Sequence, residues 1–322
     1  MKISVLGCGR WGSFIAWYLC NQGHDVYSWG PEDDYSYKVL KETGKNEYVP
    51  LDKRITLTCD LEAAVTHAEV IIISISSQGL RGFMQKIMRY DVSEKNFVLC
   101  MKGIEVSTGA RLSEVLLDSG VEKDKIAVWV GPGHIQAFTQ GIPNCMVIDS
   151  YNDELKRKLA DSFKSNLIRF YYGTDIIGSE IGAAAKNVMG ILAGVLDGCG
   201  YVSLKGALMA RGASEVARLI KALGGNALSA YGLAHLGDYE ATLFSPYSHN
   251  RAYGESLVKG DRFAKLAEGV PTADAMRRLG EKYGVDLPLT NAVYELCQSD
   301  CDQAKCNAVL DRLFARQTKY EF

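Results

Sequence analysis

The chain has 322 residues, of which 47% are hydrophobic and 23% are charged, and its formal net charge at pH 7 is −2. This length is sufficient for two domains with substantial cores. A net charge so close to zero argues against the broad basic surface by which proteins bind nucleic acid or anionic membranes.

Features near the N-terminus and the cysteines predict a cytoplasmic protein. The chain begins directly with a strand-like run and a glycine loop, so we expect no signal peptide. The apolar runs at 70–76 and 187–196 are too short to span a bilayer. Nine cysteines without a secretory signal indicate reduced thiols.

Three of these cysteines form a cluster: Cys297, Cys301 and Cys306. Their spacing suits one stripe of a helix better than a zinc site, which usually contains C-x2-C pairs. We therefore expect no metal.

The first half alternates between strand-like and helical segments. Residues 2–6 form an apolar, β-branched run, a helical pattern follows the glycine loop, and a second strand is expected at 25–29. Near-continuous apolar strands separated by helices indicate a parallel sheet covered on both faces, which is an α/β, Rossmann-like doubly wound domain. Further strand-like runs lie at 55–59, 70–76, 96–101, 125–130, 144–149 and 167–172, and helical stretches lie at 61–67, 79–89 and 109–118.

The glycine loop has the pattern G-x-G-x-x-G, with glycines at Gly7, Gly9 and Gly12. It follows the first strand and begins a helix, which is the context of a dinucleotide-binding fingerprint. The first glycine permits the tight turn, the second leaves room for a pyrophosphate, and the third lets helix and strand pack closely. The helix N-terminus supplies N–H groups to the phosphates. An ordinary glycine turn is the structural alternative.

The residues after the second strand bear on the choice between NAD and NADP. The segment Trp29–Asp34 contains three carboxylates and no arginine that could bind a 2′-phosphate. A carboxylate here accepts a hydrogen bond from the ribose 2′-hydroxyl, so NAD is favoured over NADP. A solvated acidic loop would have the same residues.

The second half is predicted to be helical. We place the domain boundary near residue 177, which gives a dinucleotide-binding domain at 1–177 and a helical substrate domain at 178–322. A substrate cleft is expected between an α/β domain and a helical domain. The expected helices lie at 178–197, 203–223, 255–268, 272–283, 290–299 and 302–317.

A single lysine, Lys186, lies in the small and apolar stretch EIGAAAKNVMGILAG. Either it points to water, or it is kept in a dry cleft for chemistry. Hydride transfer to a ketone produces an alkoxide, which needs a proton donor. A desolvated lysine would have a lowered pKa that suits this role near neutral pH.

Several motifs in fixed order connect these features: GCGRWGS, SISSQGLR, MKGIE, GPGH, IGAAAKNVMGILAG, HLGD, SHNRAYG and AEGVPTADA. Over nearly its full length the chain resembles the NAD(P)-dependent sn-glycerol-3-phosphate dehydrogenases. The resemblance implies reversible hydride transfer between NAD(P)H and C2 of dihydroxyacetone phosphate, which gives sn-glycerol 3-phosphate for glycerophospholipid synthesis. It also implies a homodimer.

The resemblance also implies roles for individual residues. The catalytic residues would be Lys186, Asp238 and Lys102, with Asp238 orienting the lysine. The substrate-binding residues would be Lys102, Asn187, Gly131, Thr242, Ser248, His249, Asn250 and Arg251. The cofactor-binding residues would be Gly7, Gly9, Arg10, Trp11, Gly12, Pro31, Lys102, Ile135, His249, Leu266 and Glu268.

The sequence departs from the family pattern at two positions. The family usually has S-G-P-[ST] where this chain has Val130–Gly133, so a hydroxyl that contacts substrate is missing at Gly133. It usually has S-R-N-R where this chain has His249 in place of the first arginine, and an imidazole cannot form the same bidentate contact with a phosphate. Arg251 or His134 would then bind the phosphate, the KM would be higher, or the substrate would differ.

Two other functions are compatible with the same sequence. One is a dehydrogenase of this architecture that acts on another phosphorylated polyol or on a β-hydroxy acid. The other is a non-catalytic NAD(H)-binding sensor, which the Lys102, Lys186 and Asp238 set argues against.

Overall fold

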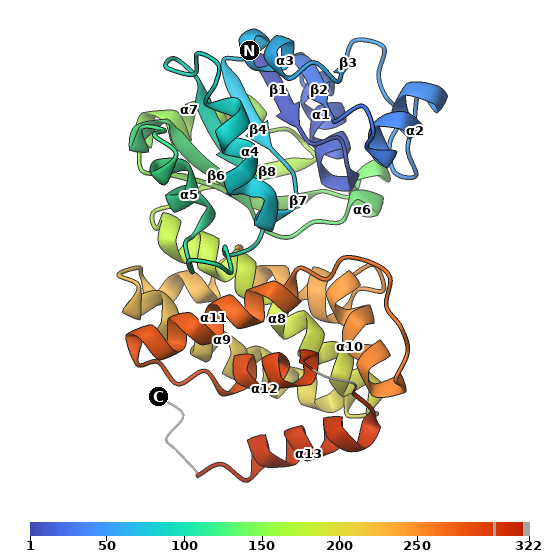
Figure 1. Cartoon of the computed structure of the whole chain (residues 1–322), viewed down its shortest axis with the longest axis vertical. Coiled ribbons are helices and arrows are strands. Elements are labelled where there is room, and N and C mark those ends of the chain that lie inside the picture. The colour runs from blue at the N-terminus through green and yellow to red at the C-terminus, as the bar shows by residue number, and fades with distance from the viewer. Residues whose placement is uncertain (299–300, 318–322) are drawn as a thin grey trace. The chain divides into compact units, whose positions relative to one another are not determined.

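The structure is a computed structural model that describes residues 1–298 and 301–317. The chain forms two compact units (Figure 1). The first unit comprises Met1–Lys102 and Ala110–Glu180, and the second comprises Gly103–Gly109 and the chain from Ile181 onward. The α/β first unit and helical second unit confirm the predicted fold class.

The strands of the first unit form an eight-stranded sheet in the order β3-β2-β1-β4-β5-β6-β7-β8. All neighbouring strands are parallel except β6 and β7. The antiparallel pair was not predicted, and it arises because the chain turns back at the edge where β6 ends instead of crossing a face. The strands are β1 (Lys2–Leu6), β2 (Asp25–Trp29), β3 (Thr56–Thr58), β4 (Val70–Ile73), β5 (Asn96–Leu99), β6 (Ile126–Val130), β7 (Asn144–Ser150) and β8 (Ile168–Tyr172).

Helices cover this sheet, and aromatic side chains fill the core beneath them. Phe14 stacks on Phe138 with ring centroids 5.0 Å apart, and Trp129 stacks on Phe163 at 5.6 Å. The sequence pattern did not show α2, α6 or α7, because they are short or mostly polar. The helices are α1 (Arg10–Asn21), α2 (Tyr35–Thr43), α3 (Leu61–His67), α4 (Leu80–Ile87), α5 (Leu112–Asp118), α6 (Ile135–Thr139) and α7 (Asp153–Phe163).

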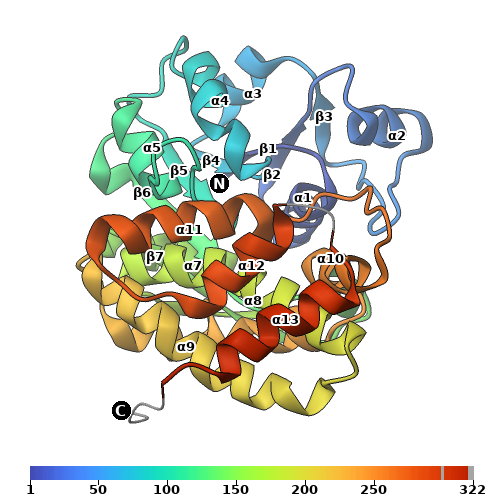
Figure 2. The same cartoon turned by 60° about the horizontal axis from the view of Figure 1, so that its bottom comes forward.

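The second unit is built from helices, and Figure 2 brings three of them, α11, α12 and α13, forward. A helix was predicted at 255–268, but α10 covers His249–Lys259 instead. Ser248 caps its start by accepting a hydrogen bond from the Arg251 N–H, and Gly260 ends it at a φ of +69°. The other helices are α8 (Ile176–Gly198), α9 (Lys205–Ala222), α11 (Gly269–Tyr283), α12 (Pro288–Cys297) and α13 (Gln303–Phe314).

The two units divide within α8 and not at its start. The first unit extends to Glu180, just beyond the predicted boundary near 177, and the second unit also includes Gly103–Gly109. Helical periodicity marks where α8 begins, but it does not show which unit binds the first turn.

The clustered cysteines do not share one helix, so that prediction was wrong. Cys297 ends α12, Cys301 precedes α13 and Cys306 lies within α13. The Sγ atoms of Cys301 and Cys306 are 3.4 Å apart, and all nine cysteines are free thiols. Among residues 1–298 and 301–317, no group of three or more His, Cys, Asp or Glu side chains is placed to hold a metal ion.

One helix within the described part of the chain, α8, is long and apolar enough to cross a membrane. However, 94% of its apolar window is buried inside the protein. A helix that is apolar on all sides and buried by other helices is typical of a protein core.

Candidate active site

The glycine loop between β1 and α1 shows why two of its glycines are required. Gly7 has a φ of +110°, and a Cβ there would lie 2.2 Å from the Ser74 carbonyl oxygen. A Cβ on Gly12 would lie 1.7 Å from the Gly7 carbonyl oxygen. Any side chain at either position would separate the loop from the sheet or from the helix.

Gly9 differs from these two glycines, because a Cβ there would meet nothing within 4 Å. Gly9 precedes α1, whose first turn has no side-chain cap and no acidic residue. The N–H groups of this turn and the space beside Gly9 therefore fit an anionic group such as a pyrophosphate. The loop fits a dinucleotide on these grounds.

The two residues after Gly9 lie against aromatic rings. The Arg10 guanidinium is 5.3 Å from the centre of the Tyr48 ring. Trp11 packs against Phe14 and Phe138, with centroid distances of 5.1 and 6.5 Å. Both side chains are partly exposed at the start of α1.

The acidic loop after β2 is exposed from Pro31 to Asp34. Asp34 caps α2 by accepting hydrogen bonds from the N–H groups of Ser36 and Tyr37, at 2.8 and 3.2 Å. Its capping role explains one of the three carboxylates without a cofactor. The prediction that NAD is preferred therefore depends on the other two carboxylates, Glu32 and Asp33.

Lys102 lies just beyond β5, at the carboxyl edge of the sheet. Its Nζ donates a hydrogen bond to the Gly131 carbonyl oxygen at 2.8 Å. Gly131 has a φ of +127°, which favours glycine, and a Cβ there would lie 3.1 Å from the Met146 Cα. Ile135 begins α6 nearby in the chain and is buried.

The glycine at position 133 has a packing reason. A Cβ on Gly133 would lie 2.4 Å from the Phe138 ring, which is itself buried and stacked on Phe14. A serine or threonine would have to displace that ring. The hydroxyl of the family pattern is therefore replaced here by aromatic packing.

Lys186 does not point to water. Its Nζ is 2.8 Å from Oδ2 of Asp238, the residue is 8% exposed, and Asp238 is fully buried. Burial disfavours the charged ammonium, whereas the carboxylate beside it favours that form. The lysine is thus held in a dry environment, with its ammonium in an ion pair with Asp238.

The small residues around Lys186 allow other backbones to approach α8 closely. A Cβ on Gly194 would lie 1.9 Å from the Arg251 carbonyl oxygen in α10, and one on Gly254 would lie 2.0 Å from that of Ile191. A Cβ on Gly269 would lie 2.5 Å from the Asn187 carbonyl oxygen. The alanines and glycines therefore serve helix packing, and they bring α10 and α11 next to the lysine turn.

A buried histidine positions the turn that carries Asp238. His235 Nδ1 is 2.8 Å from the Gly182 carbonyl oxygen, and the Tyr239 hydroxyl is 2.7 Å from Nε2. A carbonyl can only accept, so Nδ1 carries the proton, and Nε2 of the neutral ring accepts from Tyr239. Burial lowers the pKa of His235 to about 4, so the ring is neutral at pH 7.

Further polar residues join this cluster in the second unit. The Asn250 amide donates to Oδ1 of Asn187 at 3.0 Å and accepts from the Gly269 N–H at 2.9 Å. The Thr242 hydroxyl donates to the Asp238 carbonyl oxygen at 2.7 Å. Each of these side chains is at least 90% buried, so the hydrogen bonds fix their orientation.

The residues expected to bind phosphate lie at the start of α10. His249 is partly exposed in the first turn, where Ser248 is the cap. Arg251 is paired with Asp197 through Nε at 2.6 Å and with Glu255 through Nη2 at 2.6 Å. Its guanidinium is therefore already bound to two carboxylates.

The remaining predicted residues of this unit lie before α11. Leu266 is 60% exposed. Glu268 directly precedes the first residue of α11.

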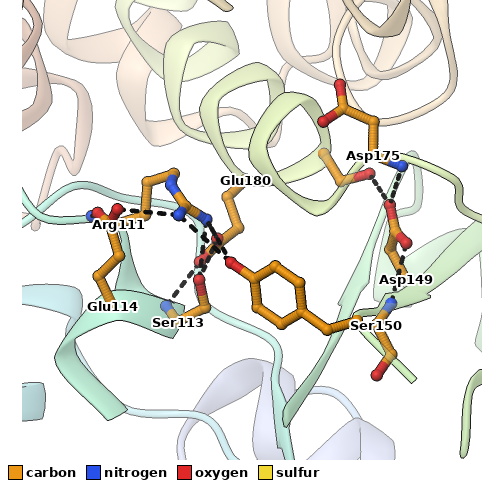
Figure 3. Close-up of polar contacts among 9 residues, drawn as sticks. Arg111, Ser113, Glu114, Asp149, Ser150, Asp175 and Glu180 are labelled. Carbon is orange, nitrogen blue, oxygen red and sulfur yellow. Dashed lines mark hydrogen bonds and ion pairs between the residues drawn. The ribbon is translucent and has the colours of Figure 1, made fainter. Parts of the chain in front are cut away.

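Buried polar contacts hold the start of α8 to β7 and to the start of α5 in the first unit (Figure 3). Glu180 accepts from the Arg111 guanidinium at 2.6 Å and from the Ser113 N–H at 2.8 Å. Asp149 accepts from the Asp175 N–H and the Ser179 hydroxyl, at 3.0 and 2.9 Å. Burial raises the pKa of Glu180, and the Arg111 charge and the hydrogen bonds from Ser113 oppose that rise, so these contacts offset only part of the desolvation.

The structure distributes the predicted residues over its two units. The glycine loop, Pro31, Lys102, Gly131 and Ile135 belong to the first unit. Residues from Lys186 to Glu268 belong to the second, where Lys186, Asn187, Asp238, Thr242 and Asn250 share one buried cluster.

Sequence reasoning did not single out several residues that position this cluster. His235 was part of the quoted motif HLGD, and its place three residues before Asp238 was the available signal. Tyr239 lies only four residues after its partner His235, but no motif marked the pair. Asp197 and Glu180 gave no signal, because Arg251 and Arg111 are distant from them in the sequence.

Comparisons with known proteins identify the family of the chain. The chain matches the N-terminus of NAD-dependent glycerol-3-phosphate dehydrogenase over residues 2–156 and the C-terminus of that family over residues 175–307.

Two relatives named glycerol-3-phosphate dehydrogenase (NAD(P)+) are each 35% identical to the chain. The one from Pelodictyon phaeoclathratiforme aligns over 309 residues, which are 92% of this chain and 93% of the relative. The one from Moorella thermoacetica aligns over 321 residues, 96% of this chain and 95% of the relative. The crystal structure of glycerol-3-phosphate dehydrogenase from Coxiella burnetii matches with a TM-score of 0.88 and 25% identity over 98% of each chain.

Proposed function

Because the chain belongs to the family of NAD-dependent glycerol-3-phosphate dehydrogenases, we propose that it reversibly reduces dihydroxyacetone phosphate to sn-glycerol 3-phosphate with NAD(P)H. The observation that carries this proposal is the buried pair of Lys186 and Asp238, 2.8 Å apart. A proton donor of this kind is what ketone reduction requires.

The first unit would hold the dinucleotide. NAD(P)H supplies the hydride when it is bound. Gly9 leaves room for the pyrophosphate, and the first turn of α1 offers N–H groups to it. Arg10 and Trp11 border the same turn, and Lys102 places a positive charge at the carboxyl edge of the sheet.

The second unit would supply the proton for the reduction. Reduction at C2 places negative charge on the C2 oxygen, and Lys186 would donate the proton from Nζ to that oxygen. Asp238 holds the ammonium in place and stabilises its charge before transfer. Asn187 and Thr242 would orient the substrate, since the cluster fixes both side chains.

The phosphate group would be bound more weakly than in the family pattern. Ser248, His249, Asn250 and Arg251 begin α10, but Arg251 is bound to Asp197 and Glu255. A bidentate contact uses two parallel N–H groups along one edge of the guanidinium. Since Nε and Nη2 of Arg251 are already engaged, Nη1 is the nitrogen left to contact a phosphate oxygen. A raised KM is therefore favoured over full replacement by Arg251.

We infer further that the enzyme is a cytoplasmic homodimer. Exposed apolar side chains in the second unit, including Val202 at 56% and Leu228 at 71%, support an interface. Light scattering of the purified protein tests this, with a mass of twice 35.3 kDa expected.

A substrate series tests the proposed activity. Oxidation of NADH would be followed by absorbance with dihydroxyacetone phosphate, with unphosphorylated dihydroxyacetone and with ketopantoate. Turnover with dihydroxyacetone phosphate alone supports the proposal, and turnover with ketopantoate favours a β-hydroxy-acid dehydrogenase. Binding of NADH without turnover on any ketone indicates a sensor and contradicts the proposal.

A further inference from the structure

The second unit contains an apolar cavity that the proposed reaction does not use. Its volume is about 170 Å³, and residues of α8, α9, α12 and α13 line it. Figure 2 labels these four helices. Nine of its ten lining residues are leucine, alanine or phenylalanine. Leu192 and Leu196 of α8, Leu208 of α9, Leu289 of α12, and Leu310 and Phe314 of α13 are among them.

The tenth lining residue is an arginine. Arg211 lies in α9 and is exposed, and within the described residues it makes no hydrogen bond or ion pair. Two other cations of this helix are bound: Arg218 donates to the Asp286 carbonyl oxygen, and Lys205 pairs with Asp197. The guanidinium beside the cavity is therefore available to an anion.

The size of the cavity limits what it can hold. An apolar cavity of about 150 Å³ accommodates a benzene molecule and stays dry. A volume of about 170 Å³ therefore holds roughly six carbon atoms. Water that enters through the opening finds no hydrogen-bond partners on the leucine walls, so an alkyl chain can displace it.

We propose that this cavity binds an aliphatic carboxylate, with an unbranched chain of about six to eight carbons among the leucines and the carboxylate on Arg211. The planar guanidinium matches a carboxylate through two parallel hydrogen bonds. The apolar walls exclude a second charge, so the ligand carries one anionic end and one alkyl end. This site is separate from the Lys186 cluster, and its existence does not depend on the proposed reaction.

A chain-length series on the full-length protein tests the apolar part of the site. Calorimetric titration with butanoate, hexanoate and octanoate should show a Kd that tightens about fourfold per methylene group until the cavity is full. The gain should end between six and eight carbons. Hexyl phosphate distinguishes a carboxylate site from a general anion site, and we expect it to bind more weakly than hexanoate. A Kd that does not depend on chain length would overturn the proposal.

Arg211→Gln tests the charged part. Hexanoate should bind about tenfold more weakly to this variant, while 1-hexanol should bind as it does to the unchanged protein. Lys221→Gln is the matched control, since it removes an exposed positive charge from the same helix away from the cavity. Equal loss in both variants would show that only net charge matters, which contradicts the proposal.

Ala207→Phe tests whether the ligand enters this cavity. Ala207 is exposed at the rim, so the larger side chain can cover the opening without disturbing the core. Binding of hexanoate and hexanol should both be lost, with melting temperature and NADH affinity unchanged. Retained binding would place the ligand elsewhere. A mass that falls by half in this variant would show that a second copy fills the cavity, and that outcome would also overturn the proposal.

Discussion

The glycine loop before α1 and the lysine helix α8 are both rich in small residues, but for opposite reasons. The space beside Gly9 is empty, whereas the space beside Gly194 is filled by the backbone of α10. We propose that the first glycine makes room for a ligand, whereas the second makes room for the protein itself. The comparison shows that a glycine-rich sequence becomes informative only when its neighbours are known.

The largest expected effect comes from removing the lysine that this packing surrounds. Lys186→Met should lower kcat by about a thousandfold, since a positioned general acid contributes 10² to 10⁴. The Kd for NADH, measured by fluorescence titration, should change less than twofold. Loss of NADH binding instead would assign Lys186 to the cofactor.

A second variant guards against simple unfolding. Lys186→Met leaves the buried Asp238 carboxylate without this cation, which is destabilising. Lys186→Met with Asp238→Asn removes both charges and should recover stability without recovering turnover. Recovered turnover would contradict a role for the lysine in proton transfer.

The next effect separates the two glycine-rich regions directly. Gly194→Ala should lower the free energy of unfolding by about 3 kcal/mol, because its Cβ would lie 1.9 Å from a backbone oxygen. Gly9→Ala should leave stability unchanged and weaken NADH binding about tenfold. Urea denaturation and NADH titration of both variants measure the contrast. Equal effects of the two variants on stability would remove the distinction.

A smaller effect concerns pH and the histidine behind Asp238. The unfolded chain protonates His235 near pH 6.5, but the folded chain does so only near pH 4, so the unfolded state binds more protons between these values. Stability from this group is present above pH 6.5 and is lost as the pH falls, by about 2 kcal/mol between pH 7 and pH 5.

The control for this pH effect is His235→Gln. Buried carboxyls such as Glu180 and Glu215 have raised pKa values and change stability with the opposite sign. These carboxyls are present in both the unchanged protein and the His235→Gln variant. The difference in unfolding free energy between these two proteins therefore measures the contribution of the histidine alone. If that difference does not shrink as the pH falls from 7 to 5, the ring is already charged in the folded state.

The smallest expected effect concerns the phosphate. His249→Arg should lower the KM for dihydroxyacetone phosphate about tenfold, because an arginine restores the bidentate contact. The value of kcat should stay the same. Steady-state kinetics at fixed NADH measure both constants, and an unchanged KM would remove position 249 from the phosphate site.

The sequence predicted features whose signal is local. Strand and helix periodicity located β1, β2 and most of the helices, and the glycine spacing located the loop before α1. It did not predict the antiparallel pair β6·β7 or the helix at His249–Lys259, because a turn direction and a serine cap outweigh apolar periodicity there.

The sequence suggested some residues of the site, but it did not predict all of their contacts. A lysine among small residues raised the right question, but the family pattern was needed to suggest Asp238 as its partner. The pairing of Arg251 with Asp197 and the contact of Gly133 with Phe138 depend on side chains that only the folded chain brings together. The spacing of residues in the sequence does not predict such contacts.

Chemical rescue tests the central claim, that Lys186 supplies the proton, more directly than any other measurement. Small primary amines would be added to a Lys186→Ala variant during the reduction of dihydroxyacetone phosphate. We predict that turnover returns in proportion to the ammonium concentration and increases with the acidity of the ammonium, with no effect on the unchanged enzyme. Turnover of the variant near its original rate without amine, or rescue that does not depend on amine acidity, would contradict the claim.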